Sequence, residues 1–149
     1  MRFDLCLGKE VAAKIIKSDK SKDIKISRAE REAALLRHSN IVQVLKVYEG
    51  PALTLITMEL CGQSLQEVLK ESSITCNQRI NIWQCICKAL KFCHKMGIVH
   101  ADVKPKNVLM GKDNQPKLAD FGSAVLMHEP YSSSNFHVNI LQFYHFLNY

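Results

Sequence analysis

The 149-residue sequence lacks an apolar run long enough to cross a bilayer. Its first seven residues include Arg2 and Asp4 and contain no apolar stretch of the kind that a secretory signal carries. Internal repeats and extended low-complexity segments are also missing. Six cysteines without a secretory signal indicate reduced thiols rather than a disulfide framework. We therefore expect a cytoplasmic protein with no membrane span.

The composition is that of a folded protein, and the net positive charge suits an anionic ligand or partner. Hydrophobic residues make up 47% of the chain and charged residues 23%, which excludes wholesale disorder. The net charge of +6 suits a nucleotide or a phosphorylated surface as well as a nucleic acid. The basic stretch 14–25 is interleaved with Asp19 and Asp23, so we interpret it as a solvated loop and expect no nucleic-acid partner.

Hydrophobic periodicity and turn residues predict strands first, with one helix among them, and then helices and short hairpins. The predicted elements are a strand at 9–16, a helix at 27–37, a hairpin of strands at 41–48 and 52–60, and helices at 64–70 and 77–96. Ser27 and Glu30 form a possible capping box for the first helix, and Gly97 would end the last.

The long helix is predicted to bury an apolar stripe. Its members fall at spacings of three and four residues: Ile80, Trp83, Ile86, Cys87, Leu90 and Cys93. Cys85, Cys87, Cys93 and His94 could suggest a zinc site, but core packing is the better interpretation because the stripe already uses two of these cysteines.

One loop after this helix carries the residue types that phosphoryl transfer requires. Asp102 is followed two residues later by Lys104 and five residues later by Asn107, and Asp120 opens an Asp-Phe-Gly sequence further on. Phosphoryl transfer needs a carboxylate for the acceptor hydroxyl, a cation at the γ-phosphate and oxygen ligands for Mg²⁺. Asn107 and Asp120 provide hard oxygen ligands of that kind. We expect His100 to hold the loop backbone.

A strand lysine provides a second candidate site. Ala12 and Lys14 lie two residues apart and therefore share one face of the predicted strand. A small residue there leaves room for a flat base, and the lysine beside it could reach phosphates. Glu30 is the better candidate to hold this lysine, with Glu32 as the fallback.

Taken together, these motifs resemble a eukaryotic protein kinase domain over about residues 8–127. Val11-Ala12-Ala13-Lys14, His38-Ser39-Asn40-Ile41-Val42, Met58-Glu59-Leu60, His100 to Asn107 and Asp120-Phe121-Gly122 occur in the order of that family. A lysine at the position of Lys104, in the catalytic loop, is usual in serine/threonine kinases. The gap from Glu30 to His38 and the hinge that ends in Gly62 are most similar to the Mos type.

The resemblance implies an α+β, two-lobed fold truncated at both ends, and assigns the site residues. It implies a small lobe at 1–61, the start of a large lobe at 62–130 and a tail unlike a kinase at 131–149. Lys14 would pair with the α- and β-phosphates, and Glu30 would orient this lysine. Met58 would be the gatekeeper, Glu59 and Cys61 would bind adenine through their backbone, and Leu109 would lie beneath it. Asp102 would be the catalytic base, Lys104 would steady the phosphate, and Asn107 and Asp120 would hold Mg²⁺.

The sequence departs from the family pattern in three places. Only Gly8 precedes Lys14 where a Gly-rich loop is expected. Ala101 replaces the arginine that pairs with a phosphorylated activation loop, so we expect no switching of that type. Nothing after Gly122 resembles the rest of a kinase, and residues 131–149 carry no Lys, Arg, Asp or Glu and six of the aromatic residues.

These features predict an ATP- and Mg²⁺-dependent serine/threonine kinase that has little or no turnover as this chain alone. By resemblance to Mos-type kinases, a MAP kinase kinase is the suggested protein substrate. The alternatives are a non-catalytic truncated kinase that competes for partners and a partial gene model. We expect a monomer or a partner-dependent chain, because a partly uncovered apolar side of the long helix predicts aggregation or dependence on a partner.

Overall fold

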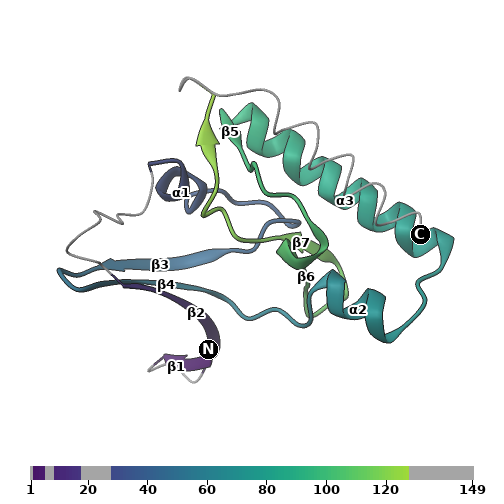
Figure 1. Ribbon diagram of the computed structural model, residues 1–149, viewed down its shortest axis with the longest axis horizontal. Coiled ribbons are helices and arrows are strands. Elements are labelled where there is room, and N and C mark those ends of the chain that lie inside the picture. The colour runs from purple at the N-terminus through teal and green to yellow at the C-terminus, as the bar shows by residue number, and fades with distance from the viewer. Residues whose placement is uncertain (1, 6–8, 18–27, 128–149) are drawn as a thin grey trace.

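The computed structural model describes residues 2–5, 9–17 and 28–127, which form a mixed α+β arrangement (Figure 1). In chain order the elements are β1 (Arg2–Leu5), β2 (Lys9–Lys17), α1 (Arg28–Ala33), β3 (Val44–Glu49), β4 (Leu53–Glu59), α2 (Leu65–Glu71), α3 (Cys76–Lys95), β5 (Ile98–Val99), the short 3-10 helix η1 (Pro105–Asn107), β6 (Val108–Met110), β7 (Pro116–Leu118) and β8 (Val125–Leu126).

An antiparallel sheet in the order β1-β2-β4-β3 forms the N-terminal part of the molecule. Lys14 lies opposite Ile56, and Ala12 lies opposite Met58. Because side chains alternate between the two faces of a sheet, these four residues lie on the same face. The sheet therefore presents the predicted lysine and the predicted gatekeeper to one side.

The predicted hairpin is present, but its first strand begins later than expected. β3 starts at Val44, whereas the prediction began at residue 41. Ile41 instead forms an isolated parallel bridge to Leu118, and the Val42 N–H donates to the Leu118 carbonyl at 2.9 Å. Residues 41 and 42 thus join the sheet region to β7, a pairing that local hydrophobicity does not reveal.

The helix predicted at 27–37 is shorter in the structure. α1 ends at Ala33, and the Arg37 guanidinium donates to the carbonyls of Ala34 and Leu36, both at 3.0 Å. These bonds use carbonyls beyond the helix end, and Leu36 turns into the core. Ser27 lies outside the described residues, so its predicted capping role is untested.

The two later helices agree closely with their predictions because both have clear start signals. Ser64 and Glu67 form a capping box at α2, and Thr75 and Gln78 form another at α3. Gly97 follows α3 with φ of 75°, a conformation that glycine adopts without the steric strain of a side chain.

The buried face of α3 differs from the predicted stripe. Ile80 is 49% exposed, and Trp83 and Cys87 are only half-buried. The buried residues of α3 are Ile82, Cys85, Ile86, Ala89, Leu90 and Cys93. Small side chains at 85 and 89 allow β7 and the segment before it to approach, and the Cys85 thiol lies 3.7 Å from Gln115 Oε1. The prediction of Ile80 as a core residue was wrong.

The central core joins α1, α2, α3 and the short C-terminal hairpins. β6 pairs with β7 and β5 pairs with β8, both antiparallel. Fully buried members of this core include Leu65, Ile86, Ile98, Val108 and Leu118. Within the described ranges, no helix has the length and apolarity needed to cross a membrane. The tail at 131–149 lies outside the described residues, and the domain boundaries stay predictions.

Candidate functional site

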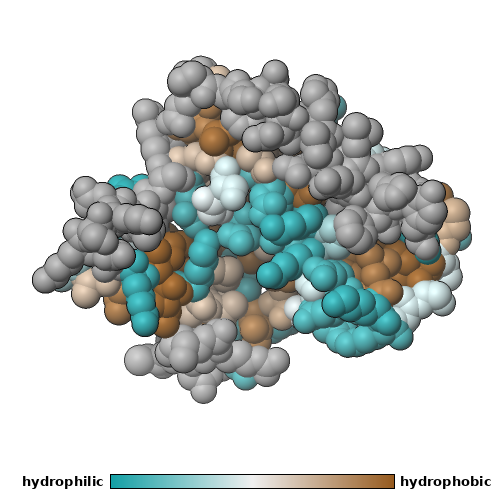
Figure 2. Space-filling model, in the orientation of Figure 1, coloured by the Kyte–Doolittle hydropathy of each residue, from teal (hydrophilic) through white to brown (hydrophobic). Residues whose placement is uncertain are grey.

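A cavity of about 320 Å³ lies between the sheet, α1 and the segment from η1 to Phe121. Figure 2 shows hydrophilic side chains gathered at the centre of the face drawn there. Of the predicted site residues, those that line the cavity are Ala12, Lys14, Glu30, Met58, Asn107, Leu109 and Asp120. The others, Glu59, Cys61, Asp102 and Lys104, are not among its described lining.

Lys14 is the centre of an ion cluster in this cavity. Its Nζ lies 3.1 Å from Glu30 Oε1 and 3.0 Å from Asp120 Oδ1. Burial alone would lower the pKa of Lys14, but hydrogen bonds to Asp120 and Glu30 outweigh it and raise that pKa. Burial alone would raise the pKa of Asp120, yet the lysine holds that pKa below its usual value. The ammonium and the Asp120 carboxylate are therefore charged at neutral pH.

Asp102, Lys104 and Asn107 form a second cluster, of which Asn107 lines the cavity. Asp102 Oδ2 accepts hydrogen bonds from Lys104 Nζ at 2.7 Å and from Asn107 Nδ2 at 2.9 Å. The same amide nitrogen donates to the Asp102 carbonyl at 2.8 Å. These bonds hold the Asp102 carboxylate through Oδ2, and Oδ1 is left to accept a hydrogen bond from another group.

His100 connects the two clusters through the backbone. Its ring is fully buried, the Asp102 N–H donates to Nδ1 at 3.3 Å, and Nε2 lies 2.9 Å from the Ala119 carbonyl. Since Nδ1 accepts, Nε2 must carry the proton and donate. The Ala119 N–H also donates to the Asn107 carbonyl at 2.8 Å. Asp102, Asn107 and the residue before Asp120 are thus held in one network.

Two residues of the site have left-handed backbone conformations, with φ of 61° at Ala101 and 59° at Asp120. Residues other than glycine adopt this backbone conformation at a cost in free energy, and such strained residues concentrate at functional sites. Ala101 directly precedes Asp102 of the second cluster, and Asp120 belongs to the ion cluster around Lys14.

Part of the predicted adenine site lines the cavity, and the role of the Glu59 and Cys61 backbone stays a prediction. Ala12, Met58 and Leu109 provide apolar lining. Burial raises the pKa of the half-buried Cys61 thiol, with the Glu59 carboxylate adding to the effect. The backbone N–H of Glu59 donates to the Gln43 carbonyl at 2.9 Å, so of its two backbone groups the carbonyl is the one left for adenine.

Lys117 forms an ion pair with Glu59 that sequence reasoning missed. Its Nζ lies 3.0 Å from Glu59 Oε1, and the same oxygen accepts the Gln43 N–H at 2.8 Å. Lys117 lies opposite Leu109, a residue that lines the cavity, in the β6–β7 pair. The ion pair therefore ties the end of β4 to β7. Its partners are 58 residues apart, and no local pattern signals such a contact.

Replacing Lys117 with Met should lower the free energy of unfolding by about 1–3 kcal/mol, because it leaves a carboxylate that is only 31% exposed without its cation. Glu59→Gln in the same background should recover part of the loss. Urea unfolding of both single variants and the double variant measures the coupling. Strictly additive effects would contradict a functional ion pair.

Asn107 and Asp120 present atoms that suit a small divalent cation. Both hydrogens of the Asn107 amide are directed to Asp102, so Oδ1 is the atom left to face a metal. Asp120 uses Oδ1 for Lys14 and the Gly122 N–H, which leaves Oδ2. Two protein oxygens with phosphates and waters completing the shell are a usual Mg²⁺ arrangement. The residues present fit this ion.

Comparison with known proteins gives consistent matches. The protein kinase domain family matches residues 5–144, which reaches into the segment that the sequence analysis set apart. A probable serine/threonine-protein kinase of Clostridium acetobutylicum is 36% identical over 133 residues, covering 85% of this chain and 20% of the relative. Serine/threonine-protein kinase PknB of Mycolicibacterium smegmatis is 34% identical over 131 residues, covering 81% and 21%. The chain spans about a fifth of the length of these relatives.

Proposed function

Because the chain belongs to the protein kinase family, we propose that its cavity binds ATP with Mg²⁺ and serves phosphoryl transfer to a serine or threonine hydroxyl of a protein. The observation that carries this proposal is the contact of one lysine with two carboxylates from distant parts of the chain, in the cavity that Asn107 also lines. An ammonium held in this way is suited to an extended polyphosphate.

In the proposed reaction the acceptor oxygen forms a bond to the γ-phosphorus while the bond from that phosphorus to the β,γ-bridging oxygen breaks and ADP leaves. Asp102 orients the hydroxyl and takes its proton on the carboxylate oxygen not used by Lys104 and Asn107. Lys104 offers its ammonium to the transferred phosphate, and Lys14 holds the α- and β-phosphates. Asn107 and Asp120 would hold Mg²⁺, which would neutralise phosphate charge there.

The protein substrate is a finer hypothesis. The Mos-type resemblance, and the MAP kinase kinase substrate that it suggests, depend on Ala101, the Met58 hinge and the spacing from Glu30 to His38. The relatives reported above are bacterial serine/threonine kinases and lend this subfamily no support. We therefore propose only a serine or threonine acceptor.

Saturating ATP with Mg²⁺ should raise the melting temperature of the chain by about 5–10 °C at a hundredfold excess over the dissociation constant. A differential scanning measurement tests this expectation. Asp102→Ala should keep the shift, since Asp102 does not line the cavity, while any radiolabel transfer from ATP to a protein acceptor should fall about 10²–10⁴-fold.

The absence of any ATP-dependent shift would favour the alternative of a non-catalytic interaction module. An unchanged transfer rate in Asp102→Ala would show that another group performs the role given to this carboxylate.

A further inference from the structure

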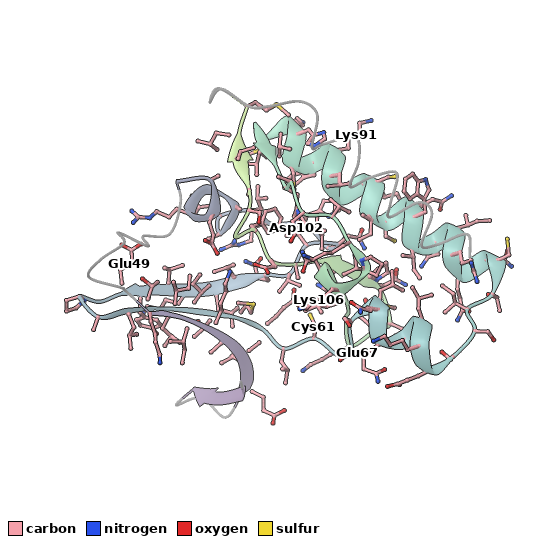
Figure 3. The ribbon with its side chains drawn as sticks, viewed as in Figure 1. Glu49, Cys61, Glu67, Lys91, Asp102 and Lys106 are labelled. Atoms are coloured by element: carbon pink, nitrogen blue, oxygen red, sulfur yellow. The ribbon has the colours of Figure 1, made fainter. Side chains whose placement is uncertain are left out.

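Lys106 is a cation of the cavity that the proposed reaction leaves without a role. It is an exposed residue of η1, lines the cavity and directly precedes the buried Asn107. In the view of Figure 3, Lys106 lies between Asp102 and Cys61.

Lys106 differs from the other lysines in and near the site because it has no carboxylate partner among the described residues. Lys14, Lys104 and Lys117 each have a carboxylate oxygen within 3.1 Å. Lys106 forms no hydrogen bond or ion pair with any described residue. Its ammonium is therefore available to an anion that enters the cavity.

The phosphate end of the cavity would gain from such a cation. Lys14 faces the two carboxylates of Glu30 and Asp120, so its single positive charge is already offset, and an unpaired ammonium would add to the charge that Mg²⁺ would supply there. Arg31 also lines the cavity but pairs with Glu49 at 3.1 Å. Of the described cations that line the cavity, Lys106 is the one whose charge no carboxylate offsets.

We propose that Lys106 binds the phosphate chain of the nucleotide, a role that rests on the proposed ATP-binding function. The ligand class is a nucleoside di- or triphosphate, with the base at the Ala12, Met58 and Leu109 end and the phosphates passing Lys106 on the way to Lys14. An acidic residue of a protein substrate is the competing anion. We favour the nucleotide over the acidic peptide because Lys106 lines the same cavity as Asn107 and Asp120.

The test compares the binding of ATP, ADP and adenosine to the wild type, Lys106→Gln, Lys106→Arg and Lys106→Glu by isothermal titration calorimetry. Lys106→Gln should weaken ATP binding about fivefold and Lys106→Glu about tenfold or more, with smaller effects on ADP. Adenosine binding should stay the same, and Lys106→Arg should restore ATP binding. The differences should shrink as salt rises.

Lys91→Gln is the matched control, since it removes an exposed lysine of α3 far from Lys106 (Figure 3). Equal ATP affinity in Lys106→Gln and Lys91→Gln, with the wild type still binding ATP, would overturn the role of Lys106 and leave the proposed function intact. Loss of binding of an Asp-containing peptide with unchanged ATP affinity would also overturn it. A wild type that binds neither ATP nor adenosine would overturn both proposals.

Discussion

Lys14→Met is expected to weaken ATP binding about 10- to 100-fold, the range for a lost hydrogen bond between charged groups. The variant removes the cation that lies within 3.1 Å of both Glu30 and Asp120. The two carboxylates then face the incoming phosphates without compensation. Adenosine carries no phosphate, so its affinity should change by less than about twofold.

Calorimetric titration with ATP and adenosine measures both affinities, and Lys17→Met is the control. Lys17 is an exposed lysine of the same strand, and its odd-numbered spacing from Lys14 places it on the opposite face of the sheet. Equal ATP binding by the two variants, or an equal loss of adenosine binding in Lys14→Met, would show that Lys14 does not serve the phosphates.

The stability that this ion cluster provides should depend on pH only at the extremes. The pKa of Asp120 is lowered, so its contribution is complete above the ordinary value of 3.8 and is lost as pH falls through the lower folded value. The pKa of Lys14 is raised, so its contribution is complete below 10.5 and is lost as pH rises through the higher folded value. The cluster should thus persist across the neutral range.

His100→Ala is expected to lower the free energy of unfolding by about 3–5 kcal/mol. The substitution opens a cavity beneath Phe121, whose ring centroid lies 4.6 Å from that of His100. It also leaves the Ala119 carbonyl and the Asp102 N–H without their partners. Guanidinium chloride unfolding measures the loss.

His100→Phe separates packing from hydrogen bonding, because it retains an aromatic ring but no ring nitrogen. It should recover part, but not all, of the stability lost in His100→Ala. A His100→Phe variant as stable as the wild type would contradict the importance of the two hydrogen bonds.

The same histidine predicts acid sensitivity. Burial lowers the pKa of His100, and also those of His38 and His94. Because the folded chain protonates this ring less readily than the unfolded chain does, the ring gives its full stability above the unfolded pKa of 6.5. Stability should decline as pH falls below this value, because the unfolded chain takes up protons first. A melting temperature that stays constant from pH 7 to about pH 5 would contradict this.

The sequence predicted the parts of the fold and site that local chemistry controls. The helices predicted at 64–70 and 77–96 lie within one residue of α2 and α3, and Gly97 follows the end of α3 as expected. The expected pairing of Lys14 with Glu30 is present as a contact of 3.1 Å. These features depend on a few neighbouring residues or on a recurring motif, which a single sequence contains.

Long-range contacts account for what the sequence could not predict. Ile80 has the right spacing for the α3 stripe, but the structure leaves it exposed and packs Cys85 and Ala89 instead. Ile41 belongs to a bridge with Leu118, 77 residues away, and not to β3. Periodicity reports which face of an element is apolar, but not which neighbour will cover it.

The central claim is that Lys14, Asn107 and Asp120 bind one Mg²⁺–triphosphate beside Asp102. A crystal structure of the chain with Mg²⁺ and a non-hydrolysable ATP analogue tests it most directly. We expect phosphate oxygens at Lys14 Nζ and a metal about 2.1 Å from Asn107 Oδ1 and from an Asp120 carboxylate oxygen. A nucleotide bound outside this cavity, or a metal held without either residue, would contradict the claim.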